Sequence, residues 1–515
     1  MARDLVVIEA SGKLRGTHQC LAALGYEASV VATLGHLYDY PPDLRDIALA
    51  WQDGELVETD RRSARPTSFT YLCDQLKACT GRLVLATDDD AEGHVIAGDV
   101  AALALTLGCR VPAMRVLPHA LTPDGWRSAL DHAKPWDPAL ASAGTARRIA
   151  DRLIAAVFSD PDKGRVVGRV QSALLGLAER QAIPSERVTM RCPAEDGQGD
   201  FVATVAWASS ATRGAALSAV PVASQGAEPL TQPWHGGDAL LALNDQLQLP
   251  IEDVSELLQA MYEAGDISYP RSPARGLRAA GAEAIAMLAR KKGVRPFHVE
   301  ALPRLPETEG PAHEAIHLQP GALMDHLDLG LPLRLCRDRR EAAATVIARH
   351  DIECGVTVAS ARPVVERLPA WAQDLPWKRE GRAPVLPWRR SLAMDGPLDT
   401  RAALVEAQMH YGVGRPSTWA SHAVRLDTTQ WLNPDGTPSV LGRLQLRVVP
   451  PTLRDPTTAR TIETILQDAQ TSVTQRVLDV MRLAFDGDGS AVDRLLDSLA
   501  SDEVADELPT PFPAF

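Results

Sequence analysis

The pattern of apolar and polar positions at the start of the chain predicts alternating strands and helices. Residues 5–8 form a short apolar run that ends at Glu9, and residues 83–86 form a second run that ends in acidic residues. Short runs of this kind, bounded by turn residues, are typical of buried strands. Residues 91–107 are apolar and alanine-rich with few helix breakers, which favours a helix. Strands alternating with helices indicate an α/β domain with a mainly parallel sheet over residues 1–120.

Beyond this domain the pattern changes several times along the chain. A helical pattern over residues 122–180 is followed by alternation typical of strands over residues 188–222. We interpret residues 224–237, which contain Pro and Gly, as a linker. The remaining segments are a helical face ending at Gly265 (251–264), a Pro- and Trp-rich connector or edge-strand region (361–397), and a helix that stops at Gly412 (400–410).

Composition narrows the class of protein. At 515 residues, 45% of them hydrophobic and 23% charged, the chain is an ordinary globular protein too long for one core. The start lacks the apolar core and cleavage site of a signal peptide, and no apolar run is long enough to cross a bilayer, so we expect a cytoplasmic protein. The seven cysteines form no C-x-x-C pair, which argues against a zinc ribbon and a disulfide framework. A net charge of −13 argues against non-specific coating of nucleic acid, but arginines can still line a groove.

Acidic residues follow both predicted strands. Asp88, Asp90 and Glu92 occupy alternate positions after the second apolar run, and Glu9 follows the first. Ligands of open α/β sheets collect outside the carboxyl ends of the strands, and carboxylate oxygens suit Mg²⁺. The acids therefore predict a magnesium site, with a solvated acidic loop as the alternative.

The second candidate for chemistry is Tyr269, which lies in an extended segment with Arg271 two residues later. A tyrosine hydroxyl has a reference pKa of about 10 and needs help to act as a nucleophile. In an extended segment Arg271 lies on the same side as Tyr269, where its guanidinium can stabilise charge on an attacked phosphate. The alternative is a core tyrosine beside a surface arginine.

Residues 312–317 contain the pattern H-E-x-x-H, which is the zinc metallopeptidase signature. That site requires His313 and His317 on one face of a long helix. Pro320 and Gly321 would end such a helix after about two turns, and no third ligand is obvious. Zinc peptidase activity therefore stays an alternative.

Two further segments carry groups that suit phosphate. In residues 414–418, Ser417 or Thr418 can cap a following helix whose N-terminus offers free N–H groups, and Arg415 adds a full charge. A plain helix cap is the alternative. Upstream, Arg148 and Asp151 are spaced to form an ion pair on one helix.

Taken together and in order, these segments resemble the type IA DNA topoisomerases over most of residues 7–420. The Toprim-like part departs from the family pattern T-D-P-D-R-E-G-E at Asp89, Ala91 and His94, and Pro273 stands where the family often has Asp. His317 and Trp419 replace the family's Arg and Tyr. The matching segments are 9–13, 35–36 and 87–93 (the Toprim domain), 146–152 and 168–172 (A-R-R-x-x-D-R and G-R-V-Q-S), 267–272 (the tyrosine segment), 312–317 (A-H-E-A-I) and 414–418 (G-R-P-S-T).

The resemblance implies a multidomain toroidal fold, with an N-terminal Toprim α/β domain joined to α and β lobes. The implied segments are the Toprim metal-binding domain (1–120), a helical DNA-binding lobe (121–190 and 397–485), a strand-rich arch (191–237 and 323–396), a lobe carrying the tyrosine (238–322) and an acidic tail (486–515).

The resemblance also implies a mechanism, in which Tyr269 attacks one DNA strand and remains joined to the 5′ phosphate. Glu9 would be the general acid and base, Lys13 and Arg271 would balance charge, and His313 would be a phosphate or proton-relay residue. Mg²⁺ would be held by Asp88, Asp90 and Glu92 with Glu9. Single-stranded DNA would contact Arg148, Asp151, Arg152, Arg169, Gln171, Ser172, Arg415, Ser417 and Thr418.

The implied enzyme is a cytoplasmic monomer that relaxes negatively supercoiled DNA or decatenates DNA. No G-x-x-x-x-G-K-[ST] loop is present, so no ATP is expected, and no zinc is expected either. Three alternatives stay open: a Toprim nuclease or primase that does not use Tyr269, a zinc peptidase, and a non-catalytic DNA-binding relative.

Overall fold

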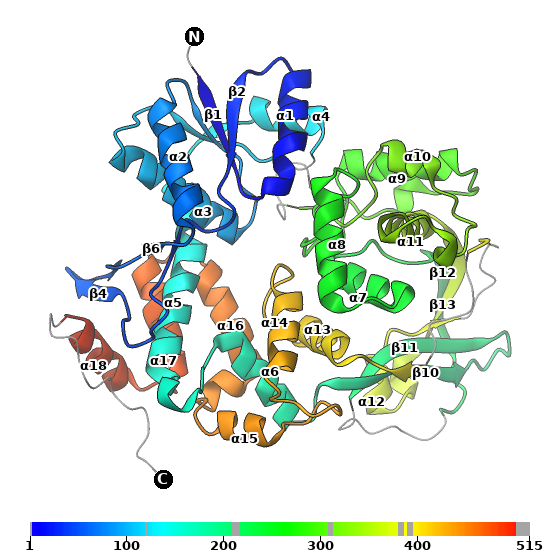
Figure 1. Cartoon of the computed structure of the whole chain (residues 1–515). Helices are drawn as coiled ribbons and strands as arrows, with labels where there is room; N and C mark the ends of the chain where they lie inside the picture. The colour runs from blue at the N-terminus through cyan, green and yellow to red at the C-terminus, as the bar shows by residue number, and fades with distance from the viewer. Residues whose placement is uncertain are drawn as a thin grey trace. The chain divides into compact units, whose positions relative to one another are not determined.

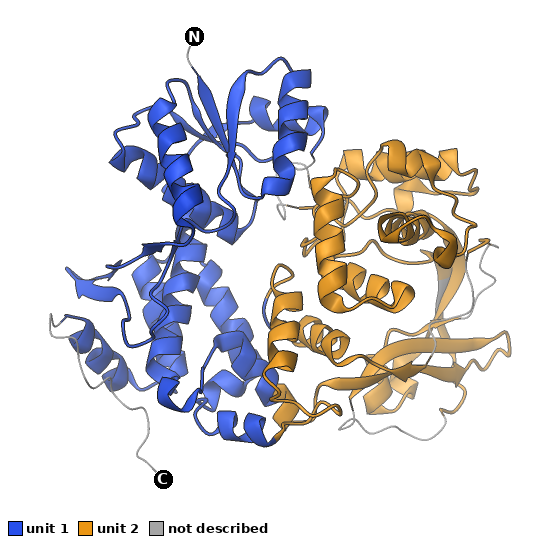
Figure 2. Cartoon of the chain, viewed as in Figure 1, with its two compact units in different colours: residues 1–176, 412–414, 440–515 blue, residues 177–411, 415–439 orange. Residues whose placement is uncertain are grey.

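A computed structural model of the chain describes residues 3–118, 121–208, 217–306, 313–379, 386–388 and 395–500. The chain divides into two compact units, each built from segments that are separated in the sequence (Figure 2). Unit 1 contains residues 1–176, 412–414 and 440–515, and unit 2 contains residues 177–411 and 415–439. The finer division into seven segments stays a prediction.

The N-terminal part of unit 1 is built on a five-stranded sheet in the order β2-β1-β7-β8-β9. The strands are parallel except β9, which runs antiparallel to β8. Both predicted strands are present as direct neighbours, because Leu5 is paired with Leu83 in the register of β1 and β7. The strands are β1 (Asp4–Ile8), β2 (Ala28–Ala32), β7 (Leu83–Leu85), β8 (Ala113–Arg115) and β9 (Lys134–Pro135).

Helices cover both faces of this sheet, which explains why its strands are continuous apolar runs. Leu5 and Val7 face a core shared with α2 (Pro66–Ala78) and α3 (Ala91–Thr106). Val6 and Ile8 face the opposite core, shared with α1 (Leu14–Ala23) and α4 (Pro123–Asp131). The two helix pairs lie on either side of the strands in Figure 1. The predicted mainly parallel sheet and the helix after the acidic loop are thus confirmed, although α4 and β9 carry this fold past residue 120.

The rest of unit 1 is mainly helical, with a core into which the hairpin β4–β5 packs. The predicted acidic tail begins inside this core, because residues 489–500 form a helix in which Leu495 is fully buried. Tail residues 501–515 lie outside the described part. The elements are β3 (Tyr38–Asp39), β4 (Leu49–Gln52), β5 (Glu55–Glu58), β6 (Arg62–Ser63), α5 (Ser142–Phe158), α6 (Arg169–Glu179, crossing into unit 2), α15 (Val440–Leu446), α16 (Pro456–Gln467), α17 (Val473–Ala484) and α18 (Gly489–Ala500).

Unit 2 combines a helical core with two antiparallel strand systems. The β10–β11 hairpin is extended on its two sides by β15 and β14, and β12 pairs separately with β13. The interpretation of residues 224–237 as a linker is wrong, because they contain most of β12 and the start of α7. The strands are β10 (Pro184–Pro193), β11 (Asp200–Ala208), β12 (Val222–Pro229), β13 (Thr357–Pro363), β14 (Lys378–Arg379) and β15 (Gly396–Pro397).

The helices of unit 2 enclose the segment that carries Tyr269, whose ring belongs to their apolar core. The helix predicted over residues 251–264 is confirmed as α8, and Gly265 ends it with a left-handed φ of 78°. Among the described residues, none of the helices is both long and apolar enough to span a membrane. The helices are α7 (Gly236–Leu247), α8 (Ile251–Glu263), α9 (Ala279–Lys291), α10 (Ala322–His326), α11 (Arg339–Cys354), α12 (Ala370–Gln373), α13 (Thr400–Tyr411) and α14 (Trp419–Thr428).

Candidate functional site

The predicted acids gather at one edge of the sheet in unit 1. Glu9 directly follows β1, Asp88 and Asp90 lie in the loop after β7, and Glu92 lies in the first turn of α3. Because β1 and β7 are adjacent and parallel, their carboxyl ends meet there. Thr87 closes the loop by donating its hydroxyl to the carbonyl of Gly93 at 2.6 Å.

Two of these acids already have partners within the protein. Lys13, in the turn after β1, forms a buried ion pair with Asp88. Asp90 caps α3, because its Oδ1 accepts from the backbone N–H of Gly93 at 2.8 Å. Within the described ranges, no three His, Cys, Asp or Glu side chains are arranged to hold a metal ion. The predicted ligands are therefore close together, but they do not form a preassembled cage.

Glu9 shows that a cation would fit this edge. Its Oε2 is buried and makes no hydrogen bond to any residue in the described part of the chain. Burial, together with the charges of Asp88 and Asp90, raises the pKa of Glu9 to about 8, although Lys13 opposes this rise. A divalent cation bound through one or two carboxylates and water would relieve this excess of negative charge.

Two serines fix the Tyr269 segment in unit 2 against the segment that contains His313 and His317. The hydroxyl of Ser268 donates to Ala315 O at 2.9 Å and accepts from His317 N at 3.0 Å. The hydroxyl of Ser272 donates to His313 O at 3.2 Å. Both serines are buried, so the register between the two segments is set by satisfied polar groups in an apolar surrounding.

This register places aromatic rings on two sides of Tyr269. The ring of His313 stacks on it with centroids 3.9 Å apart, and Tyr262 meets it edge-on at 5.4 Å. Tyr269 is 3% exposed, so a substrate reaches its hydroxyl only when the groups around it move. The predicted neighbourhood of Tyr269 and His313 is thus present within unit 2.

The structure excludes the zinc peptidase alternative. Residues 313–318 form no helix, and Ile316 and Leu318 make isolated bridges to Trp234 and Ile267. His317 is fully buried against its own chain, with Nδ1 3.0 Å from Ala315 O. The two histidines therefore share no helical face on which a zinc ion could bind. Ala312, the first residue of the quoted motif, lies outside the described residues.

The N-terminus of α7 packs against the backbone that follows Tyr269. The N–H of Gly236 donates to Ser272 O at 2.8 Å, and a Cβ at Gly236 would come within 2.8 Å of Pro270 O. His235 caps this helix through Nδ1 and contacts the ring of Trp419 at 5.7 Å. Trp419 is buried, so it fills the core rather than offering a face to a base. Arg271 is half-buried, and nothing in the structure explains why Pro273 follows the motif.

The arginines predicted to hold DNA along α5 and α6 are used inside unit 1. Arg148 binds Glu58 through Nε at 2.9 Å and Nη2 at 2.6 Å, rather than its predicted partner Asp151. Arg152 donates to backbone carbonyls, including that of Asp43 at 2.8 Å. Asp151 instead accepts from Arg169 Nε at 3.0 Å. These contacts favour a structural role for the three arginines.

The other residues predicted to bind DNA differ in their surroundings. Gln171 and Ser172 are buried in α6. Thr418 precedes α14 as expected, but its hydroxyl donates to Arg415 O at 3.3 Å instead of capping the helix. Arg415 and Ser417 are half-buried. The assignment of Arg415, Ser417 and Thr418 to a phosphate contact stays a prediction.

Several residues that shape the site were not predicted. Arg115 reaches from β8 under the acidic loop, and Glu58 and Glu463 hold the arginines of α5 and α6. The partners of Glu58 and Glu463 are distant in the sequence, so no local pattern reveals these contacts. For Arg115 the available signal was a charged residue inside an apolar strand pattern.

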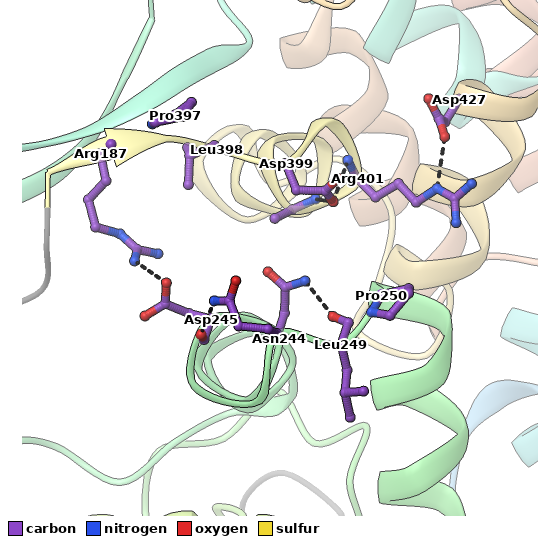
Figure 3. Close-up of a pocket in the computed structure, with 13 residues that line it drawn as sticks. Arg187, Asn244, Asp245, Leu249, Pro250, Pro397, Leu398, Asp399, Arg401 and Asp427 are labelled. Carbon is purple, nitrogen blue, oxygen red and sulfur yellow. Dashed lines mark hydrogen bonds and ion pairs between the residues drawn. The ribbon is translucent and has the colours of Figure 1, made fainter. Parts of the chain in front are cut away.

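A separate cavity of about 490 Å³ lies in unit 2 between α7, β10, β15 and the start of α13 (Figure 3). Its charges are paired within the protein: Arg187 contacts Asp245 at 3.2 Å, and Arg401 contacts Asp427 at 2.8 Å (Figure 3). None of the predicted site residues lines this cavity. We interpret it as the junction between the strands and the helices rather than as the reaction site.

Comparison with known proteins supports one family. No family model matches the chain. In sequence it is similar to DNA topoisomerase 1 of Treponema pallidum, with 28% identity over 214 residues, which are 39% of this chain and 28% of that protein. It is also similar to DNA topoisomerase 1 of Synechocystis, with 30% identity over 190 residues, which are 34% of this chain and 20% of that protein. The chain therefore spans less than a third of the length of these curated relatives.

The fold is similar to that of a solved structure, full-length topoisomerase I from Thermotoga maritima. The TM-score is 0.64, and the match covers 94% of this chain and 90% of that chain at 17% sequence identity. At this identity the likeness shows a shared multidomain fold, which agrees with the predicted fold class.

Proposed function

We propose that the chain is a relative of the bacterial type IA DNA topoisomerases in sequence and fold, and that it cuts and rejoins one DNA strand through Tyr269. The observation that carries the proposal is the register set by Ser268 and Ser272, which stacks His313 on Tyr269. A core tyrosine needs no such arrangement of a histidine ring and a nearby arginine.

In the proposed step, Tyr269 Oη attacks phosphorus while the bond from phosphorus to the 3′ oxygen breaks. The 5′ phosphate stays on the tyrosine, and the 3′ oxygen leaves as a hydroxyl after taking a proton from Glu9. A raised pKa suits Glu9 for this role because the carboxyl keeps its proton near neutral pH. Arg271 supplies positive charge to the phosphate, His313 receives or relays the tyrosine proton, and rejoining reverses each transfer.

Mg²⁺ would add positive charge beside the reacting phosphate when bound. The residues that would hold it are Asp88, Asp90 and Glu92, and Glu9 would join them in its deprotonated form, once it has given up the proton. The buried Oε2 of Glu9, which makes no hydrogen bond within the described part of the chain, supports this assignment. Lys13 would then balance charge between Asp88 and the phosphate. We propose further that the protein acts as a cytoplasmic monomer on single-stranded segments of supercoiled or catenated DNA.

The test uses the full chain with negatively supercoiled plasmid, Mg²⁺ and no ATP. Stepwise relaxation and a covalent protein–DNA adduct are expected from wild type and are expected to be lost in Tyr269→Phe. Tyr262→Phe is the matched control, because it removes a hydroxyl from the neighbouring ring and leaves the nucleophile in place. Relaxation by Tyr269→Phe at the wild-type rate would show that the proposal is wrong.

Two alternatives give different products in the same assay. Linear or nicked DNA from both wild type and Tyr269→Phe, without an adduct, would indicate a Toprim nuclease. Binding of single-stranded DNA without cleavage by either protein would indicate a non-catalytic relative.

A further inference from the structure

The acidic loop after β7 contains backbone carbonyl groups that the sheet does not satisfy. The strand ends at Leu85, and the next ladder-like bond joins Ala86 N to Val7 O at 2.8 Å. Beyond this point the chain turns toward α3 and needs other donors for its carbonyl oxygens.

One side chain supplies these donors. Arg115, the last residue of β8, donates from Nη1 to Thr87 O at 2.8 Å. The same Nη1 also reaches Leu85 O at the end of β7 at 2.9 Å, a carbonyl that already accepts from Val116 N at 3.1 Å. Its Nη2 donates to Asp88 O at 2.7 Å. The planar guanidinium therefore joins the end of β7 to two carbonyl groups at the start of the acidic loop, and a lysine ammonium does not have the geometry to make these three bonds together.

Arg115 is placed where a charge is costly unless acids surround it. The residue is 4% exposed, and burial lowers its pKa to about 10 against the opposing charges of Asp89 and Asp88. Its charge thus balances the acids from beneath while its hydrogen bonds go to the backbone.

His94 and Asp89 extend the same network. Arg115 approaches His94 Nδ1 from Nε at 3.4 Å and from Nη2 at 3.3 Å. Since arginine can only donate, Nδ1 is the acceptor and the ring proton lies on Nε2, 3.3 Å from Asp89 Oδ1. Asp89 and His94, two positions at which this chain departs from the Toprim pattern, therefore contact each other, and Arg115 contacts the His94 ring of this pair.

We propose that Arg115 is a positioning residue that holds the Asp88–Glu92 loop in the shape that receives a divalent cation. The proposal rests on the proposed function for the identity of that cation as Mg²⁺. Arg115 itself touches neither the cation nor the DNA; it acts through the backbone of the acids.

If Arg115 acted through its charge alone, its removal would strengthen cation binding instead of weakening it. Removing a positive charge from an acidic edge strengthens its attraction for a cation, whereas releasing the loop weakens binding. Arg115→Lys separates these effects, because it keeps the charge and loses the three-carbonyl geometry. The probe is Mn²⁺, with free metal measured by electron paramagnetic resonance on the full chain without DNA.

Arg115→Lys is expected to lower Mn²⁺ affinity by about 10- to 100-fold, as changes to the support of metal ligands do. Arg110→Lys, on the exposed connection before β8, is the matched control and should bind like wild type. Methylguanidinium added to Arg115→Ala should restore affinity, which a general loss of folding would not allow; circular dichroism confirms that each variant is folded.

Unchanged or tighter Mn²⁺ binding by Arg115→Lys overturns the proposal, and so does absence of Mn²⁺ binding by wild type at the acidic loop. Tyr269→Phe distinguishes this inference from the proposed function, since it should bind Mn²⁺ normally. A wild type that binds Mn²⁺ in an Arg115-dependent way but never relaxes DNA would refute the proposed function and leave the role of Arg115 intact.

Discussion

Glu58 is at the centre of a buried charge cluster that tests whether Arg148 shapes unit 1 or contacts DNA. The carboxylate accepts from Arg148 at 2.6 and 2.9 Å, from Arg61 at 3.3 Å and from Tyr40 at 2.5 Å. Arg61 also donates to Asp99 at 2.5 Å. The four charged side chains are between 10% and 18% exposed, so water screens them only weakly.

Glu58→Gln keeps the shape of the side chain and leaves two guanidinium groups facing one carboxylate. Breaking a buried pair by removing one partner costs about 3–5 kcal/mol, and the remaining Asp99 and slight exposure place this case near the lower value, about 3 kcal/mol. Arg148→Met should cost a similar amount. Because both changes break the same pair, the double variant should lose about 1–3 kcal/mol less than the sum of the single losses.

Hydrogen exchange followed by mass spectrometry measures the loss where it occurs. A loss of about 3 kcal/mol speeds exchange through unfolding by roughly 100-fold in peptides from β5, α3 and α5. Arg45→Met, which removes an exposed pair with Asp162, should leave exchange unchanged.

The salt dependence of single-stranded DNA binding supplies the second measurement. Loss of a phosphate contact lowers the slope of log affinity against log salt by about 0.7–1. Arg148→Met should keep the wild-type slope. Wild-type exchange combined with a lower slope in Arg148→Met would show that Arg148 contacts phosphate and that the reasoning from the cluster is wrong.

Three further outcomes follow from single contacts. Gly93→Ala would bring a Cβ to 2.1 Å from Asp88 O, so it should lower the free energy of unfolding by about 1–3 kcal/mol and weaken Mn²⁺ binding. Gly98→Ala is the control, because its Cβ would lie 3.4 Å from the nearest atom; equal melting temperatures of the two variants would contradict this prediction. Ser268→Ala leaves the His317 N–H unpaired, so the free energy of unfolding should fall by about 1–3 kcal/mol and single-turnover cleavage should slow. Cleavage by Ser268→Ala as fast as by the exposed control Ser421→Ala would show that the serine contacts do not position Tyr269. Burial lowers the pKa of His350 from 6.5 to about 3, so protonation favours the unfolded chain, and the free energy of unfolding should fall as pH drops from about 6.5 toward 3, by about 3 kcal/mol at about pH 4. If the urea midpoint of His350→Gln falls equally over this range, the loss belongs to other groups.

The parts of the fold that could be predicted are those that local pattern controls. The apolar runs before Glu9 and Asp88 became neighbouring parallel strands, because a run buried on both faces has few alternatives in an α/β domain. Residues 224–237 failed for the opposite reason. Their Pro and Gly content is typical of loops, but pairing with β13, more than 100 residues later, makes most of them a strand and the start of a helix.

Candidate site residues were predictable by type and position, whereas their partners were not. Arg169 was assigned to DNA from its motif, but Glu463, 294 residues away, already binds it in the structure. A motif indicates that a charged side chain is needed at a position, but it does not indicate which acid, carbonyl or phosphate that side chain contacts. Arg115 shows where sequence reasoning can go further: a charged residue that ends an apolar strand must find partners at that strand end, and the acids had already been placed there. A buried charge in a strand pattern is therefore best interpreted together with the loop that follows the neighbouring strand.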